Sequence, residues 1–200
     1  YDIITMARDN AGNNEDYSVK STFTFIVDLT TPTSIVTFPA NNSFLSGASA
    51  ITGMADDSVE NLKGYSENGR TYESGIASTG VFVALQRLSD NKWWDGSSFA
   101  SNDMVWNEAS FVGSSSGTWS YSLTPTAIED GTTYYVMSKA VDKAGNYQIS
   151  WTTNFFTGDM TNPVSIATYP TGTVESVLRI GGTASDTPPG ELKETNGIWI

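Results

Sequence analysis

A recurring block of sequence constrains this chain more than any other feature. The segment ARDNAGN, which begins at Ala7, returns as AVDKAGN from Ala140, and two further segments return in the same order after it. The recurring pairs are residues 7–13 with 140–146, 25–39 with 156–170, and 51–57 with 180–186. About 130 residues separate the members of each pair. This spacing is the length of a small domain, so the pattern predicts a tandem array of similar domains.

The repeat divides the 200 residues into one complete unit between two partial units. We expect residues 1–29 to supply the C-terminal strands of a preceding repeat, residues 30–157 to form a complete repeat, and residues 158–200 to supply the N-terminal strands of the following repeat. The chain begins and ends inside strand-like runs, at Tyr1 and Ile200, so we expect both ends to be cut from a longer chain. Any secretion signal or anchor would then lie outside these residues.

The complete unit reads as all-β. Short alternating or β-branched runs are separated by Gly, Asn, Asp, Pro and Ser, and no stretch has helical periodicity. The expected strands span residues 33–38, 49–55, 80–88, 118–123, 132–141 and 147–156. The dipeptide Asp95-Gly96 is typical of a two-residue hairpin, so we expect an inserted pair of strands between the third and fourth of these.

One tyrosine suggests the topology. Tyr134 follows Asp130-Gly131 and stands two residues before Val136, at the start of the expected fifth strand. This arrangement resembles the tyrosine corner of immunoglobulin domains, with Val at the position of the Cys. The alternative is a tyrosine that only packs in the core.

The order of the motifs is more specific. The chain carries D-x-A-G-N, a strand, D-x-T-x-P, I-x-G-x-A-x-D and then G-[VI]-x-[VI], over essentially its whole length. This order resembles the immunoglobulin-like tandem repeats of giant bacterial surface proteins and adhesins. The resemblance implies extracellular or cell-surface β-sandwich repeats, often stiffened by calcium, that serve as a stalk, filament or adhesive surface.

Composition excludes several functions. The chain has no Cys and no His, which rules out disulfides, thiolate metal sites, catalytic triads and the usual zinc sites. The net charge of −12 disfavours nucleic acid and anionic membranes as partners, and it fits either a solubility role or the binding of cations. A glycosidase needs only two carboxylates, but the acidic residues here recur at turns and linkers. We therefore expect no enzymatic activity.

The carboxylates predict a metal site under the immunoglobulin topology. There the loop after the second strand, the turn before the last strand and the segment that leads into the first strand meet at one pole. Calcium takes six to eight oxygen ligands, and such a pole would supply several. Of the adjacent Asp56 and Asp57, Asp57 is the expected ligand because it aligns with Asp186. The candidate calcium ligands are Asp28, Asp57, Asp142 and Asn146 at the first junction, Asp159 and Asp186 at the next, and Asp9 and Asn13 in the preceding repeat.

The D-x-A-G-N motif has a simpler interpretation as well. Gly in the left-handed conformation, with Asp and Asn bonded to neighbouring amides, makes a good hairpin turn without any metal. The motif alone favours the turn, and the metal interpretation depends on distant acidic segments coming together.

Aromatic residues supply a second candidate site. Val81 and Val83 align with Ile198 and Ile200, so Phe82 and its counterpart Trp199 should lie on the outer face of their sheets. Such an aromatic residue is either covered by the hairpin that carries Trp93 and Trp94, stacked on carbohydrate, or in contact with another chain. The candidate residues for a lateral contact are Phe82, Trp199, Trp93 and Trp94.

Together these patterns predict a structural module. Its partners would be the neighbouring repeats of the same chain and, in a filament, other copies, with no nucleic acid and no membrane insertion in this segment. The alternative is an adhesin domain that binds a glycan or protein through residues 57–79 or through the Trp-rich hairpin.

Overall fold

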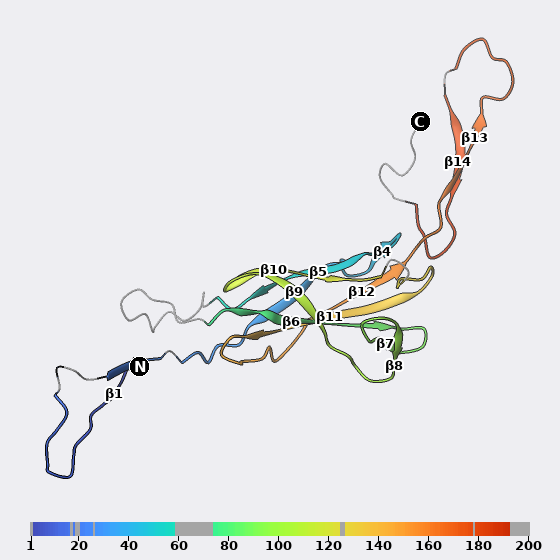
Figure 1. Ribbon diagram of the computed structural model, residues 1–200. Coiled ribbons are helices and arrows are strands. Elements are labelled where there is room, and N and C mark those ends of the chain that lie inside the picture. Colours follow the sequence, from blue (N-terminus) through green and yellow to red (C-terminus); the bar gives the residue numbers. More distant parts are fainter. Residues whose placement is uncertain are drawn as a thin grey trace.

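The protein is built almost entirely of β-strands. The computed structural model describes residues 2–16, 18, 21–25, 27–58, 74–124, 127–177 and 179–192. Within these ranges the chain forms fourteen strands, and the predicted all-β class is confirmed. No helix in the described part of the chain is long and apolar enough to cross a membrane. Figure 1 shows a central β-unit with one two-stranded hairpin beyond each of its ends.

The central unit is a single curled sheet. Its ten strands are β3 (Thr33–Phe38), β4 (Ser43–Leu45), β5 (Ala50–Asp56), β6 (Ile76–Arg87), β7 (Lys92–Trp94), β8 (Phe99–Ser101), β9 (Asn107–Gly113), β10 (Ser116–Ser122), β11 (Thr133–Asp142) and β12 (Thr153–Gly158). The strand order is β3-β5-β10-β9-β6-β11-β12-β4, with the β7–β8 hairpin attached to β6. β9 pairs with both β10 and β6, so it joins two layers into one sheet.

The hairpins at the two ends repeat parts of the central unit. β1 (Asp2–Thr5) pairs with β2 (Ser21–Thr24) as β11 pairs with β12. β13 (Val164–Tyr169) pairs with β14 (Gly181–Ser185) as β3 pairs with β5, and both of these pairs shift register near the same point. The sequence repeat is therefore also a repeat of strand pairing.

The core lies between the two layers and follows the alternation of the strands. Val81 and Val83 of β6 are 0% and 1% exposed, as their alternation with Phe82 predicts. Trp119 of β10 is also buried, and it passes directly over Gly53. A Cβ at Gly53 would lie 2.2 Å from the Trp119 ring, so this glycine of the I-x-G-x-A-x-D motif is required for packing.

Most of the expected strands form, and the departures have local causes. β4 and β9 were not predicted, because three residues are too few to show a period and NEASFVG mixes strand formers with Glu, Ala and Gly. The last expected strand begins at Thr153 rather than at residue 147. Before it, the side chain of Gln148 accepts a hydrogen bond from the Ala140 amide and donates to the Ser34 carbonyl, which places this segment across the edge of the sheet.

The inserted hairpin exists, but its turn is longer than predicted. β7 and β8 are joined by residues 95–98, and the Asp95 amide donates to the Ser98 carbonyl. The Asp95 carboxylate accepts the amides of Ser97 and Ser98 at 2.9 and 2.8 Å. These bonds favour a four-residue turn over the two-residue turn that Asp95-Gly96 suggested.

Tyr134 lies in the core and bonds to the backbone that precedes β11. Its side chain is fully buried and stacks on Phe156 with the ring centroids 5.2 Å apart. Its hydroxyl accepts a hydrogen bond from the Glu129 amide at 2.8 Å and donates to the Ala127 carbonyl at 3.4 Å. Tyr134 therefore ties the start of β11 to the chain that precedes it.

Replacing Tyr134 with Phe tests this connection. Tyr134→Phe should lower the free energy of unfolding by about 1 kcal/mol, because the part-buried hydrogen bond from the Glu129 amide is lost. Urea denaturation measures the change. Tyr147→Phe is the control at a tyrosine that is 63% exposed, and it should change stability by less than about 0.5 kcal/mol. Equal effects of the two variants would contradict the interpretation.

Candidate metal centre

Three aspartates from distant parts of the sequence meet at one pole of the central unit. Asp28 lies in the leading linker, which we define as residues 27–32, Asp57 directly follows β5, and Asp142 ends β11. One carboxylate oxygen of each lies within 4.8 Å of those of the other two. The three residues are 9%, 4% and 3% exposed, respectively. The expected convergence of these three residues is therefore observed.

The side chain of Asp28 is held by hydrogen bonds from the leading linker itself and from the segment before β6. Its Oδ1 accepts the backbone amide of Thr30 at 2.9 Å and also the Thr30 hydroxyl. Its Oδ2 accepts the amide of Ser74 at 2.7 Å, from the segment that leads into β6. Burial alone raises the pKa of Asp28, but these hydrogen bonds together outweigh it and leave the pKa below its ordinary value. The side chain is therefore held as a carboxylate.

Asp57 is held by the start of the β6 segment. Its Oδ2 accepts the Gly75 amide at 2.8 Å, and its own amide donates to the Ser115 carbonyl. Gly75 has a φ of +75°, and a Cβ there would lie 2.9 Å from the Ser114 carbonyl oxygen, so no larger residue fits without a shift. Asp56, in contrast, is exposed, as the alternation along β5 predicts.

Asp142 is held by its own turn. Asn146 donates to it twice, from the backbone amide to Oδ1 at 2.8 Å and from the side-chain amide to Oδ2 at 2.7 Å. The same side-chain nitrogen lies 3.1 Å from the Asp28 carbonyl and donates to it. Asn146 thus connects the turn to the leading linker and orients Asp142.

The D-x-A-G-N motif is a hairpin turn at both of its occurrences. Asn13 donates to Asp9 with the same two bonds, both at 2.8 Å, and Gly12 and Gly145 have φ angles of +93° and +94°. The hydrogen bonds from Asn13 lower the pKa of Asp9. Asp9 is exposed, and within the described residues it belongs to no group of three carboxylates. The motif therefore forms a turn by itself, and the surroundings decide whether its Asp joins a cluster.

The second junction brings its two aspartates together around a glycine. A Cβ at Gly190 would lie 2.4 Å from Asp186 Oδ2 and 2.8 Å from Asp159 Oδ2. The Thr161 hydroxyl donates to Asp159 at 3.2 Å, as the Thr30 hydroxyl does to Asp28. Asp159 therefore repeats the threonine bond of Asp28, and it lies close to Asp186, the counterpart of Asp57.

The first junction has the chemistry of a site for a hard cation. The group offers only oxygen atoms, and each carboxylate oxygen that accepts one amide keeps a second lone pair for a metal. Within the described part of the chain, neither Asp28 nor Asp142 forms an ion pair with Lys or Arg. Three carboxylates at this spacing repel one another, so a cation among them would stabilise the junction. The group could hold a metal ion.

Several residues of the site were missed in the sequence. The backbone amide of Ser74 donates to Asp28 and that of Gly75 donates to Asp57. No pattern in this Gly/Ser-rich stretch of sequence indicates either contact. Thr30 could have been found, because the Thr of D-x-T-x-P recurs as Thr161. Its role is to donate to the Asp two residues before it.

The Trp-rich hairpin does not supply a lateral contact. Trp94 is 2% exposed and its indole nitrogen donates to the Tyr121 hydroxyl at 2.9 Å. Trp93 is 9% exposed and packs with Ala84 and Met137 on the other face of the sheet. The prediction of both tryptophans as lateral contacts is wrong, because packing within the domain buries them.

Phe82 keeps part of its surface exposed. It is covered in part by Lys139, whose ammonium lies 5.4 Å from the Phe82 ring and 4.4 Å from the Trp106 ring. Lys139 rather than the Trp93–Trp94 hairpin therefore makes the described contact with the Phe82 ring, and Trp199 lies outside the described residues.

Comparison with protein-family models and with curated proteins finds no match for this chain.

The bond from Asn146 to the linker gives a direct test of the junction. Asn146→Ala removes the contact with the Asp28 carbonyl, so the amide of Thr30 should exchange with solvent about fivefold faster, which corresponds to about 1 kcal/mol. Hydrogen exchange followed by NMR measures it. Asn13→Ala removes the side-chain bond to Asp9 in the exposed turn, where no bond to a linker is lost, and is the matched control. Unchanged exchange at Thr30 in Asn146→Ala would show that Asn146 does not hold the linker.

Proposed function

We propose that this chain is a structural module of a tandem immunoglobulin-like array outside the cell or at its surface. A calcium ion at each domain junction would stiffen the array, which would serve as a stalk, filament or surface layer. The observation that carries the proposal is the group formed by Asp28, Asp57 and Asp142, because one ligand comes from the linker and two from the body of the domain.

The strand order supports the immunoglobulin-like assignment. Immunoglobulin constant domains place strands A, B, E and D in one sheet and C, F and G in the other. With β3, β5, β6, β9, β10, β11 and β12 taken as A to G, the order β3-β5-β10-β9 corresponds to A-B-E-D, and β6-β11-β12 corresponds to C-F-G. Tyr134 has the position and the backbone contacts of the tyrosine corner.

The donor set supports calcium over other cations. Zinc and copper favour nitrogen and sulfur ligands, and the chain has neither His nor Cys. Magnesium demands near-ideal octahedral geometry, whereas calcium tolerates irregular arrangements of carboxylate and carbonyl oxygens. The three aspartates come from a linker and from the ends of two strands, so no single regular element arranges them, and calcium is the better fit.

A structural role follows from where the ion would sit. An ion bound by Asp28 and by Asp57 and Asp142 would fix the leading linker to the domain body. The carboxylates are already held by backbone amides, which suits a fixed site better than a catalytic one. We therefore propose no enzymatic activity. The alternative is an adhesin that binds a glycan or protein through residues 57–79, of which residues 59–73 lie outside the described ranges.

Calcium should stabilise the protein through the first junction. A cation that binds only the folded state adds about 2.7 kcal/mol at a hundredfold excess over its Kd, so the melting temperature should rise with calcium and fall with chelator. Asp142→Ala should abolish this response. Differential scanning calorimetry of the 200-residue chain, with calcium or with chelator, measures it.

Asp9→Ala is the matched control, since it breaks the same turn outside any described carboxylate cluster and should leave the response intact. Small-angle scattering should also detect a less extended chain in chelator, because the linker loses its tie to the domain. If calcium changes neither the melting temperature nor the scattering, the D-x-A-G-N segments are turns only and the proposed cation role is wrong.

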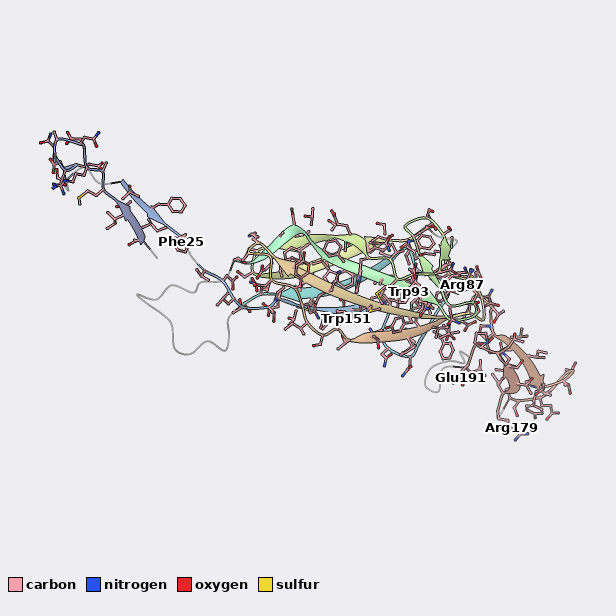
Figure 2. All side chains as sticks on the ribbon, turned by 90° about the horizontal axis from the view of Figure 1, so that it is seen from below. Phe25, Arg87, Trp93, Trp151, Arg179 and Glu191 are labelled. Atoms are coloured by element: carbon pink, nitrogen blue, oxygen red, sulfur yellow. The ribbon has the colours of Figure 1, made fainter. Side chains whose placement is uncertain are left out.

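An apolar stripe supports lateral contact between copies of the chain. Tyr147, Ile149 and Trp151 alternate along the segment before β12 and are 63%, 82% and 42% exposed. Trp151 packs edge-on against Trp106 at 5.6 Å, so its ring is held in place at the surface of the central unit, where Figure 2 labels it. Side chains of this kind gathered at one surface are typical of protein contacts.

The stripe predicts an effect on association without an effect on folding. Ile149→Ser should weaken self-association in sedimentation velocity, whereas the melting temperature should change little, because surface substitutions usually cost less than about 0.5 kcal/mol. Val112→Ser is the control at an aliphatic residue of β9 that is 72% exposed. A chain that stays monomeric at every concentration, or equal losses in both variants, would contradict lateral assembly through this stripe.

A further inference from the structure

A row of three outward side chains crosses the strands β11, β6 and β9. Lys139 of β11 is paired with Phe82 of β6, and Phe82 is paired with Glu108 of β9. Paired residues of antiparallel strands lie on the same face of a sheet, and neighbouring strands are about 4.8 Å apart. Lys139 and Glu108 therefore flank Phe82 on the outer face, one strand away on either side. We call these three residues the charged row.

The two charges of the row have no opposite charge beside them within the described part of the chain. Both salt bridges found there belong to Arg87. The Lys139 ammonium instead lies against the rings of Phe82 and Trp106, and burial lowers the pKa of this lysine. Glu108 is exposed. A carboxylate brought from outside would therefore complete the surroundings of Lys139, and an ammonium would do so for Glu108.

The charged row is complementary to itself. A two-fold axis that runs parallel to the strands, over Phe82, places a second copy face to face with the first. This rotation exchanges the two sides of the row, so Lys139 of each copy faces Glu108 of the other and the two Phe82 rings meet. An axis across the strands would instead place Lys139 on Lys139 and Glu108 on Glu108. The charges therefore favour one orientation of the pair and oppose the other.

The favoured orientation aligns the two chains. Because the axis is parallel to the strands, β6 and β11 of one copy run in the same direction as β6 and β11 of the other. The strands of the central unit run along its length (Figure 1). Two arrays joined at this face would therefore lie side by side with the same polarity.

The charged row continues the apolar stripe of Tyr147, Ile149 and Trp151. The Trp106 ring lies 4.4 Å from the Lys139 ammonium, and Trp151 packs edge-on against Trp106. The row and the stripe thus belong to one surface, with exposed apolar side chains beside a pair of charges. Apolar contact area supplies most of the affinity at such a surface, whereas charges decide the orientation.

The charged row is particular to this repeat. The position of Lys139 is occupied by Met6 in the preceding repeat, since Ala7 aligns with Ala140. A reciprocal charge pair at this face therefore matches the central unit with the central unit of another copy. Such a match would set which repeats of two arrays lie beside each other.

We propose that the charged row is where a second copy of this chain docks, in parallel orientation, through two reciprocal pairs of Lys139 and Glu108. The proposal rests on the lateral contact proposed above. It adds the partner residues, the orientation of the two copies and the register of the two arrays.

Reversal of the charges tests the proposal with the 200-residue chain. Lys139→Glu and Glu108→Lys each place like charges opposite one another at both ends of the row, so each should raise the Kd of self-association about tenfold in sedimentation velocity. An equimolar mixture of the two variants should associate as the unchanged chain does, because every Glu then faces a Lys. The double variant should also associate, for the same reason.

Lys92→Glu is the matched control for the change in net charge. Lys92 lies opposite Arg87 at the far end of β6, away from the charged row, so its reversal should leave the Kd nearly unchanged. Thermal unfolding checks that each variant folds. Glu108 is exposed, so Glu108→Lys should cost less than about 0.5 kcal/mol of stability, and it keeps the test informative if Lys139→Glu does not fold.

The outcomes separate the docking geometry from the lateral contact itself. If the mixture and the double variant associate as weakly as the single variants, Lys139 and Glu108 do not face each other and the proposal is wrong. If the reversals change nothing while Ile149→Ser weakens association, the stripe makes the contact without the charged row. If the unchanged chain stays monomeric and its tryptophan fluorescence responds to oligogalacturonate, but that of Lys139→Glu does not, the face binds an acidic saccharide and the second copy is refuted.

Discussion

The double pairing of β9 is the constraint on which the rest of the structure depends. By pairing with β10 on one side and β6 on the other, it joins two layers into one curled sheet with a common core. This curl brings the end of β5, the end of β11 and the start of β3 to the same pole. The convergence of Asp28, Asp57 and Asp142 is therefore a consequence of sheet topology rather than of local sequence.

Burying carboxylates at such a pole costs free energy, and the chain offsets part of that cost with backbone amides. Ser74, Gly75 and Asn146 each donate an amide to one of the three aspartates. These bonds orient the carboxylates before any ion arrives, which lowers the cost of ordering them on binding. Because Asp28 belongs to the leading linker, the charge of the cluster acts directly on that linker.

The two poles of the central unit differ in what connects them to the chain. At the leading pole, the Asp28 carboxylate accepts the Ser74 amide, and the Asn146 side chain donates to the Asp28 carbonyl. At the trailing pole, backbone bonds from Asp159 and Met160 hold the chain to Leu45 and to the Asp130 side chain. Side chains therefore hold the chain at the leading pole, whereas backbone amides hold it at the trailing pole.

The sequence by itself determined the features that depend on local period or on recurrence: the all-β class, the repeat of about 130 residues, the turn formed by D-x-A-G-N, and the burial of Asp57 rather than Asp56. Only the tertiary structure decided the rest. Trp93 and Trp94 read as a surface pair, yet contacts with residues distant in sequence bury both. Ser74 carries no signal as a partner of Asp28, because its bond to Asp28 spans 46 residues. Asn146 was expected beside Asp28 as a metal ligand, but its bond to the Asp28 carbonyl, across 118 residues, was not expected. Local patterns record which face of a strand is buried, whereas such contacts exist only once the sheet has curled.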